Sequence, residues 1–490
     1  MASPLMLSVS GCRGVVGESL TPEVAARFAG AFGTFLKARG GGRGVTVVIG
    51  RDGRRGGEVI QHAAIAGLIG AGCEVVDLGV AMTPTTAVMT DAVGRAAHGR
   101  AVAGMVLTAS HNPQMWNGLK CLLAEGGEFG SAACAPPPDV AASIIAAFRD
   151  CQVAWAGWEH VGAVSAEHSA VDEHVDRLMH AIESSGVSDI PSRLGEGLRV
   201  AVDSVNASGV DGARVCLESL GCEEILHIGS DSTGLFSHAP EPTRENLSQP
   251  GGLCDAVRGG ECHVGFAQDP DADRLAIIDE KGEYIGEEYT LALCAMALLE
   301  SSGTKPDALL VTNLSTSRML DDVAARYGAR VIRTPVGEAH VVAAMKQEAA
   351  AGRSVICGGE GNGGLIWPRV TYVRDSLASM ALVIGLLDGG RRSVSELVAG
   401  LPSYAIEKRK VDLKSREAAT PTLEAIAKAY ASERVDRSDG VWVDFASRRA
   451  WLHVRASNTE PIMRFIAEAP TSAAANALLD EAMKLVPMQK

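Results

Sequence analysis

The feature that most constrains the fold is a rhythm of short apolar strands and amphipathic helices that recurs three times along the chain. The strand patterns are continuous apolar runs such as VTVVIG at residues 45–50, which are typical of strands buried on both faces of a parallel sheet. Helical patterns lie between them at 58–71, 210–220 and 319–327, and the other strand patterns are 74–78, 102–107, 198–203, 224–228, 263–268, 308–313, 330–333 and 353–357. We therefore predict three similar mixed-sheet α/β domains.

The C-terminal part, from about residue 403, has a different character. It is richer in charged residues, with a helical pattern at 423–432 and strand patterns at 440–444 and 451–454. A chain of 490 residues is too long for one core, because domains usually contain about 100–200 residues. We predict α/β domains at 1–160, 161–290 and 291–402, and a smaller α+β domain at 403–490.

The composition excludes several classes of partner. A net charge of −14 argues against a surface for nucleic acid or an anionic membrane, since both need basic patches. No apolar run is as long as a membrane span, and residues 1–13 lack the pattern of a signal peptide. Eleven cysteines are scattered without a C-x-x-C pair, which indicates reduced thiols. We expect a cytoplasmic protein that binds small molecules, with no nucleic-acid or membrane partner.

Four polar loops follow predicted strands, which is where open α/β sheets bind their ligands. The first loop follows the strand pattern at 102–107 and reads T-A-S-H-N-P, with Ser110 beside His111 at the strand end. Ser110 is a candidate nucleophile, and a capped turn is the alternative. The chain has no G-x-S-x-G motif in this loop, so an ordinary hydrolase triad is not supported.

The second loop, D-P-D-A-D-R, contains three aspartates at alternate positions, Asp269, Asp271 and Asp273. Neighbouring carboxylates repel one another at neutral pH unless a cation neutralises them. Oxygen ligands without cysteine or histidine suit Mg²⁺ or Ca²⁺ rather than zinc. An EF-hand is excluded because Arg274 stands where that loop requires glycine. A metal site accounts for this loop better than a solvated acidic turn does.

The third loop, G-G-E-G-N-G-G at residues 358–364, formally contains G-x-G-x-x-G. The residues that follow, L-I-W-P, do not begin a helix, so the dinucleotide-binding fingerprint is excluded. A carboxylate and an amide on a glycine frame, Glu360 and Asn362, suit neighbouring hydroxyls of a sugar. A flexible turn is the alternative.

The fourth loop, R-A-S-N-T-E-P, follows the strand pattern at 451–454. A guanidinium, hydroxyls, an amide and exposed backbone N–H groups together form a cradle for an anion. The residues concerned are Arg455, Ser457, Asn458 and Thr459, with Arg464 beyond them. Arg13, in the N-terminal S-G-C-R-G segment, is a further candidate for neutralising a phosphate, with a surface salt bridge as the alternative.

These loops, in this order, resemble the α-D-phosphohexomutase superfamily over essentially the whole chain. That superfamily includes phosphoglucomutases, phosphomannomutases and phosphoglucosamine mutases, and the resemblance implies four domains in a heart shape around a central cleft. The resemblance implies that Ser110 is phosphorylated, that Lys120, in N-G-L-K, lies near it, and that Mg²⁺ is bound by Asp269, Asp271 and Asp273 together with Ser110. It implies that Glu360 and Asn362 bind sugar hydroxyls and that Thr334, Val336 and Gly337 belong to a substrate loop. The distal phosphate is implied to be bound by Arg455, Ser457, Asn458, Thr459 and Arg464.

The resemblance also implies a mechanism. Phosphorylated Ser110 would donate its phosphoryl group to the free hydroxyl of a hexose 1- or 6-phosphate, with a hexose 1,6-bisphosphate as intermediate and activator. Positioning and charge neutralisation govern such transfers, and Arg13, Arg274 and Lys120 would add positive charge to that of Mg²⁺. We expect a monomer or a homodimer.

One position departs from the superfamily pattern. Many members have a histidine where this chain has Gly364. Another group must then assist proton transfer, and the candidates are His111, Lys120 and His340.

The sugar is less constrained than the reaction. The G-E-G-N-G-G loop together with W-N-G-L-K favours a phosphoglucosamine mutase, with a phosphomannomutase/phosphoglucomutase as the alternative. A metal-dependent sugar phosphatase and a non-catalytic sugar-phosphate-binding protein belong to other functional classes. Neither needs all four loops, so the mutase is the better prediction.

Overall fold

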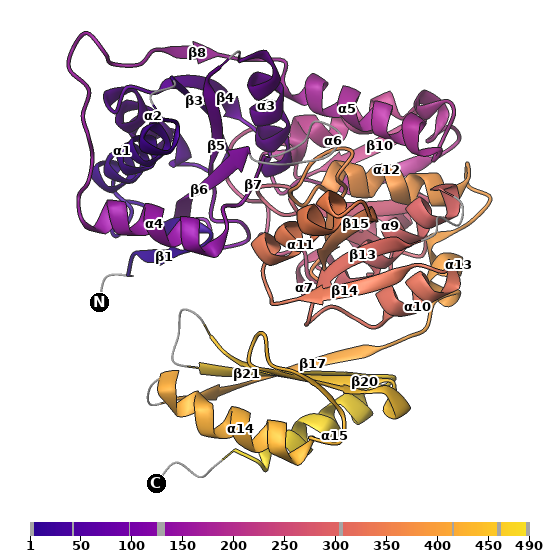
Figure 1. The fold of residues 1–490 in the computed structure, drawn as a ribbon. Coiled ribbons are helices and arrows are strands. Elements are labelled where there is room, and N and C mark those ends of the chain that lie inside the picture. Colours follow the sequence, from indigo (N-terminus) through magenta and orange to yellow (C-terminus); the bar gives the residue numbers. More distant parts are fainter. Residues whose placement is uncertain are drawn as a thin grey trace.

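The structure is a computed structural model that describes residues 4–41, 44–97, 99–124, 133–302, 307–413, 416–457 and 462–486 (Figure 1). Three α/β regions pack together in the upper part of the view, and a smaller C-terminal region lies below them. The predicted four-domain α/β fold is confirmed. We call the four regions domains I to IV.

Domain I is built on an eight-stranded sheet with the order β1-β2-β6-β5-β3-β4-β8, in which β7 also pairs with β6. Its strands are β1 (Met6–Ser8), β2 (Gly11–Val15), β3 (Val45–Arg51), β4 (Glu74–Val80), β5 (Ala101–Leu107), β6 (Trp116–Ala124), β7 (Ala133–Cys134) and β8 (Val164–Ala166). Its helices are α1 (Pro22–Arg39), α2 (Gly57–Gly70), α3 (Thr83–Ala96) and α4 (Pro138–Arg149). As the sequence indicates, Thr21 caps α1 and proline occupies its first turn.

Domains II and III each contain a four-stranded sheet, ordered β10-β9-β11-β12 and β14-β13-β15-β16. The strands are β9 (Arg199–Asp203), β10 (Glu224–Ile228), β11 (Val264–Gln268), β12 (Leu275–Ile278), β13 (Ala308–Asn313), β14 (Arg330–Thr334), β15 (Ser354–Glu360) and β16 (Gly364–Ile366). The helices are α5 (Ala170–Ser185), α6 (Gly209–Ser219), α7 (Arg244–Leu247), α8 (Leu253–Gly259), α9 (Glu287–Ser302), α10 (Met319–Arg326), α11 (Glu338–Ala350), α12 (Ser376–Leu387) and α13 (Val394–Ala399).

The three α/β regions repeat one topology. The repeated unit has four strands and begins at β3, β9 or β13. This first strand of the unit lies between two parallel partners, and the fourth strand runs antiparallel to the third, as in β4-β3-β5-β6. The loops joining third to fourth strands are residues 108–115, 269–274 and 361–363. Three of the four loops singled out in the sequence are therefore the same connection in three repeats, at the carboxyl ends of the parallel strands.

Two loop boundaries differ from the prediction because both strands continue. β15 runs to Glu360, where Glu360 pairs with Gly364 of β16, so the glycine-rich segment is a tight hairpin rather than a long loop. β20 runs to Ala456 and pairs with β21, so Arg455 lies on a strand. Helix α14 begins at Thr420, three residues before the predicted start at 423.

Domain IV is a five-stranded antiparallel sheet, ordered β17-β21-β20-β19-β18. Its strands are β17 (Ala405–Asp412), β18 (Arg434–Asp436), β19 (Val441–Phe445), β20 (Ala450–Ala456) and β21 (Ile462–Ala469), and its helices are α14 (Thr420–Ala429) and α15 (Ser472–Met483). The helices cover the lower face of the sheet in Figure 1, and its upper face points toward domains I to III. That upper face is available for a ligand held between the domains.

The hydrophobic cores show which regions are packed into one unit. One core joins β9, β11, α5 and α6 to α9, α10 and α12, so domains II and III share it. The sheet of domain I and domain IV each have a separate principal core. β8 lies beyond residue 160 but pairs with β4, so a boundary at 160 separates this strand from its sheet. α9 spans residue 290, so a boundary there falls inside a helix. Within the described residues, no helix has both the length and the apolar character needed to cross a membrane.

Candidate active site

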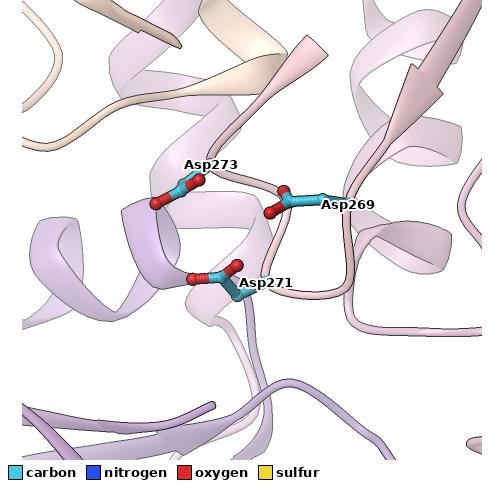
Figure 2. A group of neighbouring side chains, drawn as sticks. All are labelled: Asp269, Asp271 and Asp273. Carbon is cyan, nitrogen blue, oxygen red and sulfur yellow. The ribbon is translucent and has the colours of Figure 1, made fainter. Parts of the chain in front are cut away.

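The loop between β11 and β12 brings three aspartates together at the centre of the molecule. Asp269, Asp271 and Asp273 are all buried, and one carboxylate oxygen from each lies within 4.8 Å of the others. Figure 2 shows the three carboxylates facing a common space from a single tight loop. Ala272 adopts φ 52°, a left-handed conformation that lets the loop turn within so few residues.

The charges of this cluster fit a divalent cation. Burial raises the pKa of Asp269 well above its usual range, and the neighbouring Asp271 and Asp273 raise it further. Asp271 Oδ1 and Asp273 Oδ1 are buried and have no hydrogen-bond partner among the described residues. Three buried oxygen donors with this surplus of negative charge suit a hard ion such as Mg²⁺.

Groups from other domains fix the remaining carboxylate oxygens. Thr83 Oγ1, at the start of α3, donates to Asp271 Oδ2 at 2.7 Å. Arg374 Nη2 donates to Asp273 Oδ2 at 2.5 Å. Burial alone would raise the pKa of Asp273, but Arg374 and Lys120 outweigh it and lower that pKa to about 2. Asp273 is therefore an anion even without a metal.

Ser110 lies directly against this cluster. Its Oγ donates to Asp269 Oδ2 at 2.9 Å, although 159 positions separate the two residues. Ser110 has φ 50°, in the left-handed region, and only 5% of the residue is exposed. The domain I loop thus presents one hydroxyl to the aspartates of domain II.

A buried arginine braces the Ser110 loop. Arg54 is 1% exposed; its Nη2 donates to Ser110 O at 2.6 Å and its Nη1 to Trp116 O at 2.6 Å. Its Nε donates to Asp52 Oδ2 at 2.8 Å. Hydrogen bonds at both ends of the loop hold the backbone of Ser110 in its unusual conformation.

Positive side chains predicted from the sequence surround Ser110. Lys120 Nζ lies 3.7 Å from Asp273 Oδ2, and Arg274 Nε lies 3.9 Å from Asp273 Oδ1. Burial lowers the pKa of Arg13, although Asp271 and Asp273 partly oppose this, and its Nε has no hydrogen-bond partner in the described part of the chain. These cations are placed to receive an anionic group.

His111 is a second titratable neighbour of the Ser110 hydroxyl, after Asp269. Its Nδ1 lies 3.3 Å from Ser110 Oγ. Burial lowers the pKa of His111 to about 3, and the charges of Arg274 and Arg13 act in the same direction. The imidazole is therefore neutral at physiological pH.

The hairpin between β15 and β16 carries the predicted sugar-binding pair. Glu360 Oε1 accepts a hydrogen bond from Asn313 Nδ2 at 2.9 Å, and Oε2 accepts one from Arg374 Nη1 at 3.1 Å. Asn362 Oδ1 is buried without a hydrogen-bond partner among the described atoms. Asn362 thus keeps an acceptor for a ligand donor.

Two cavities meet at this hairpin. One, of about 560 Å³, is lined by Ser110 and by the loop of residues 269–274, which we call the metal loop. The other, of about 550 Å³, lies against the upper face of the domain IV sheet. Both cavities share four lining residues, His111, Val336, Glu360 and Asn362, so they are two chambers of one cleft.

The domain IV chamber has a row of cations along one wall. Lys410, Arg464 and Arg455 lie directly opposite one another on β17, β21 and β20, and therefore on one face of the sheet. Arg464 Nε is buried without a hydrogen-bond partner among the described residues. Asp439 accepts from Arg455 Nε at 3.1 Å and also from the backbone N–H of Val336 at 3.1 Å. Adjacent like charges of this kind favour a bound anion.

The remaining predicted residues occupy less uniform positions. Gly337 lines the Ser110 chamber and adopts φ 127°. Thr334 is buried at the end of β14, and its hydroxyl donates to Pro335 O. Ser457 is buried and its backbone N–H donates to Ile462 O at 2.9 Å. Asn458 and Thr459 lie outside the described residues.

Four family models match the chain in succession. The phosphoglucomutase/phosphomannomutase α/β/α domains I, II and III match residues 6–135, 172–282 and 287–404, and the C-terminal domain of the same family matches residues 410–485. The chain belongs to the phosphoglucomutase/phosphomannomutase family. The resemblance to the α-D-phosphohexomutase superfamily is thereby confirmed.

Relatives in this family match nearly end to end. The chain is 34% identical to a probable phosphoglucosamine mutase of Methanopyrus kandleri over 481 residues, which are 97% of this chain and 96% of the relative. It is 34% identical to a phosphoglucomutase/phosphomannomutase of Thermococcus kodakarensis, covering 97% of each chain. A crystal structure of a family member from Burkholderia thailandensis covers 99% of each chain with a TM-score of 0.78 and 24% identity, which shows the same fold.

Several residues at the centre of this family member's site carry no recognisable local motif. They are Arg54, Arg374, Asp439 and Lys410. Arg374 precedes Asp375, which caps α12, and a helix-capping pattern was the one signal available there. Arg54 and Arg374 contact residues far away in the chain, so only the folded structure reveals these contacts.

Proposed function

We propose that the protein is a phosphohexomutase that interconverts hexose 1-phosphates and hexose 6-phosphates, with glucosamine phosphate as its preferred substrate. The observation that supports this most strongly is the two-chamber cleft. Ser110 and the metal loop line one chamber, the cation row lines the other, and Glu360 and Asn362 lie where they meet. A hexose bearing phosphate at either end fits such a cleft in two orientations.

Ser110 carries the phosphoryl group in this proposal. The bond between Ser110 Oγ and phosphorus breaks as the substrate's free hydroxyl oxygen forms a new bond to phosphorus. The proton of that hydroxyl passes to Ser110 Oγ, which leaves as the free serine hydroxyl. The resulting hexose 1,6-bisphosphate turns end for end, and its other phosphate returns to Ser110 Oγ. Trace hexose 1,6-bisphosphate would activate the enzyme by phosphorylating free Ser110.

Asp269, Asp271 and Asp273 would hold Mg²⁺ together with the phosphorylated Ser110. The bound ion would neutralise charge on the transferring oxygens. Arg13, Lys120 and Arg274 line the same chamber and would add positive charge there. Positioning and electrostatics therefore account for the catalysis we propose.

The domain IV chamber would hold the phosphate that is not being transferred. Arg464 and Arg455 offer charge-assisted donors on the cation row, and we propose that Ser457, Asn458 and Thr459 add to this cradle. Glu360 and Asn362 would bind the sugar hydroxyls, with Val336 and Gly337 beside them. Thr334 would support that loop through its hydroxyl, which donates to Pro335 O.

The preference for glucosamine phosphate is supported by the relatives. The relative from Methanopyrus kandleri is a probable phosphoglucosamine mutase, whereas the one from Thermococcus kodakarensis is a phosphoglucomutase/phosphomannomutase. The alternative substrates are therefore glucose and mannose phosphates. All eleven cysteines are free thiols, which supports a cytoplasmic location.

A coupled mutase assay tests the proposal. Purified protein with Mg²⁺ and a trace of hexose 1,6-bisphosphate is supplied in parallel with glucosamine, glucose and mannose phosphates. We expect isomerisation with the highest kcat/KM for glucosamine phosphate. Release of inorganic phosphate without isomerisation would indicate a phosphatase instead, and binding without turnover would indicate a sugar-phosphate-binding protein.

A further inference from the structure

Arg374 connects three carboxylates that belong to three separate parts of the site. Its Nη2 donates to Asp273 Oδ2 at 2.5 Å, its Nε to Glu338 Oε2 at 2.8 Å and its Nη1 to Glu360 Oε2 at 3.1 Å. The residue is 8% exposed and lines the Ser110 chamber. One guanidinium therefore sets the orientation of the metal loop, of the first residue of α11, and of the hairpin between β15 and β16, which we call the sugar hairpin.

The geometry of the guanidinium makes this connection specific. Its N–H groups form a rigid planar fork, whereas the ammonium of lysine is a flexible point charge. With Oδ2 of Asp273 bound to Arg374, Oδ1 is left without a hydrogen-bond partner in the described structure. The other oxygen of Glu360 is held by Asn313. At Asp273, the arginine thus binds Oδ2 and leaves Oδ1 for the ion.

Gly364 provides the space through which the Arg374 side chain passes. A Cβ added to Gly364 would lie 2.2 Å from Arg374 Cδ and 2.9 Å from its Cγ. The φ angle of Gly364 is not in the left-handed region, so glycine is required here for space and not for backbone freedom. This is the position where many superfamily members have a histidine.

The backbone of Arg374 is firmly anchored. The next residue, Asp375, caps α12 by accepting a hydrogen bond from Leu377 N at 2.9 Å. Its other oxygen lies 3.0 Å from His174 Nε2, and the side chains of both residues are fully buried. Displacing the guanidinium therefore requires a change in its own side chain or at Gly364.

We propose that Arg374 is a positioning residue that couples the metal loop to the sugar hairpin, and that Gly364 is present in order to admit its side chain. The effect on turnover rests on the proposed mutase function, but the effect on Mg²⁺ binding does not. Partners outside the metal's own ligands commonly alter metal affinity by about 10- to 100-fold. A misplacement of about 1 Å in a catalytic group can lower a rate by roughly 100-fold.

Two substitutions test this without removing any charge. Arg374→Lys keeps the cation and loses the fork, and Gly364→Ala keeps the arginine and displaces it. In each variant we expect Mg²⁺ affinity, measured by calorimetry, to fall roughly tenfold, and kcat/KM to fall roughly 100-fold. Both substitutions disturb the same contacts of the Arg374 guanidinium. The Mg²⁺ affinity and the kcat/KM of the double variant should therefore be no more than about threefold below those of either single variant.

The controls separate positioning from folding. Gly259→Ala, at an exposed helical glycine with nothing within 4 Å of the added Cβ, should leave Mg²⁺ affinity and turnover unchanged. The thermal unfolding temperature of every variant is measured first and compared with the assay temperature. Unchanged Mg²⁺ affinity and turnover in both variants, losses that add in the double variant, or unfolding of both at the assay temperature would each overturn the proposal. If the wild-type protein showed no mutase activity but the variants showed the expected loss of Mg²⁺ affinity, only the proposed function would be overturned.

Discussion

The metal loop of domain II and the cation row of domain IV both concentrate like charges, but the groups that hold these charges come from different parts of the molecule. In the metal loop, Thr83 and Arg374 from other segments hold one oxygen each of Asp271 and Asp273. In the cation row, Arg464 Nε has no hydrogen-bond partner in the described structure. Residues of other domains therefore hold part of the acidic site, whereas Asp439 of domain IV itself pairs with Arg455 of the cation row. Both sites keep buried polar atoms for a ligand, Asp271 Oδ1 and Asp273 Oδ1 in one and Arg464 Nε in the other.

The two regions also differ in how they are attached. The metal loop belongs to the core shared by domains II and III, whereas domain IV has its own core. Polar contacts join domain IV to domain III, among them Ser315 Oγ to His453 Nδ1 at 2.8 Å and Arg318 Nη1 to Asp444 Oδ1 at 2.5 Å. Changes at the metal loop should therefore alter the chemical step, and changes at the cation row should alter binding.

The largest effect should come from Ser110, which lies on the acidic side of the cleft. Ser110→Ala removes the group that we propose carries phosphate, and loss of a covalent nucleophile lowers kcat by on the order of 10⁴- to 10⁶-fold. Mutase activity and the phosphate content of the protein are measured together. Near-normal turnover in this variant would rule out the phosphoserine mechanism.

The next effect should come from the metal ligands. Asp271→Asn keeps an oxygen that accepts from Thr83 but removes a charge, so Mg²⁺ affinity should fall and kcat should fall by roughly 10²- to 10³-fold. Chelation of Mg²⁺ should abolish wild-type activity, and added Mg²⁺ should restore it. If KM alone changed in this variant, the acidic loop would be a binding element like the cation row.

A smaller effect, of a different kind, should follow at the cation row. Arg464→Met removes a donor to the distal phosphate, and a charge-assisted hydrogen bond is worth about 1.5–3 kcal/mol, or roughly 10- to 100-fold in affinity. We expect KM to rise by this factor while kcat stays within about threefold. Arg448→Met, at an exposed arginine paired with Glu481, is the matched control and should change neither constant.

The smallest effect concerns His111, which lines both chambers. Because its pKa falls to about 3 in the folded protein, from 6.5, the unfolded chain binds more protons between these values. Its contribution to stability is therefore complete above pH 6.5 and is lost as the pH falls toward 3. Urea unfolding at pH 7 and pH 4.5 should show a weaker loss of stability on acidification for His111→Asn than for the wild type, and an equal loss would contradict this assignment.

The sequence was sufficient wherever function depends on adjacent residues. Ser110 and the three aspartates stand in short motifs after clear strand patterns, and their elements form as predicted. β15 was predicted to end at Cys357 because Gly358 and Gly359 read as a loop, yet pairing with β16 keeps them in the strand. Helix α14 starts earlier than its apolar pattern because a proline occupies its first turn.

The sequence was insufficient wherever a side chain acts across domains. Arg374 is 101 positions from Asp273, and Arg54 is 56 positions from Ser110. A buried arginine has no period or spacing that distinguishes it from a surface one, because its burial depends on partners that only the tertiary fold supplies. For the same reason, the requirement for glycine at position 364 could not be predicted from the sequence of the loop alone.

The backbone at Ser110 has a consequence for which amino acid can occupy this position. A left-handed φ of 50° costs an ordinary residue about 1–2 kcal/mol, and β-branched residues are especially disfavoured there. Threonine offers the same hydroxyl chemistry, but its extra methyl group conflicts with this turn. Local stereochemistry thus favours the unbranched alcohol at the position that we propose carries phosphate, independently of any demand made by the reaction.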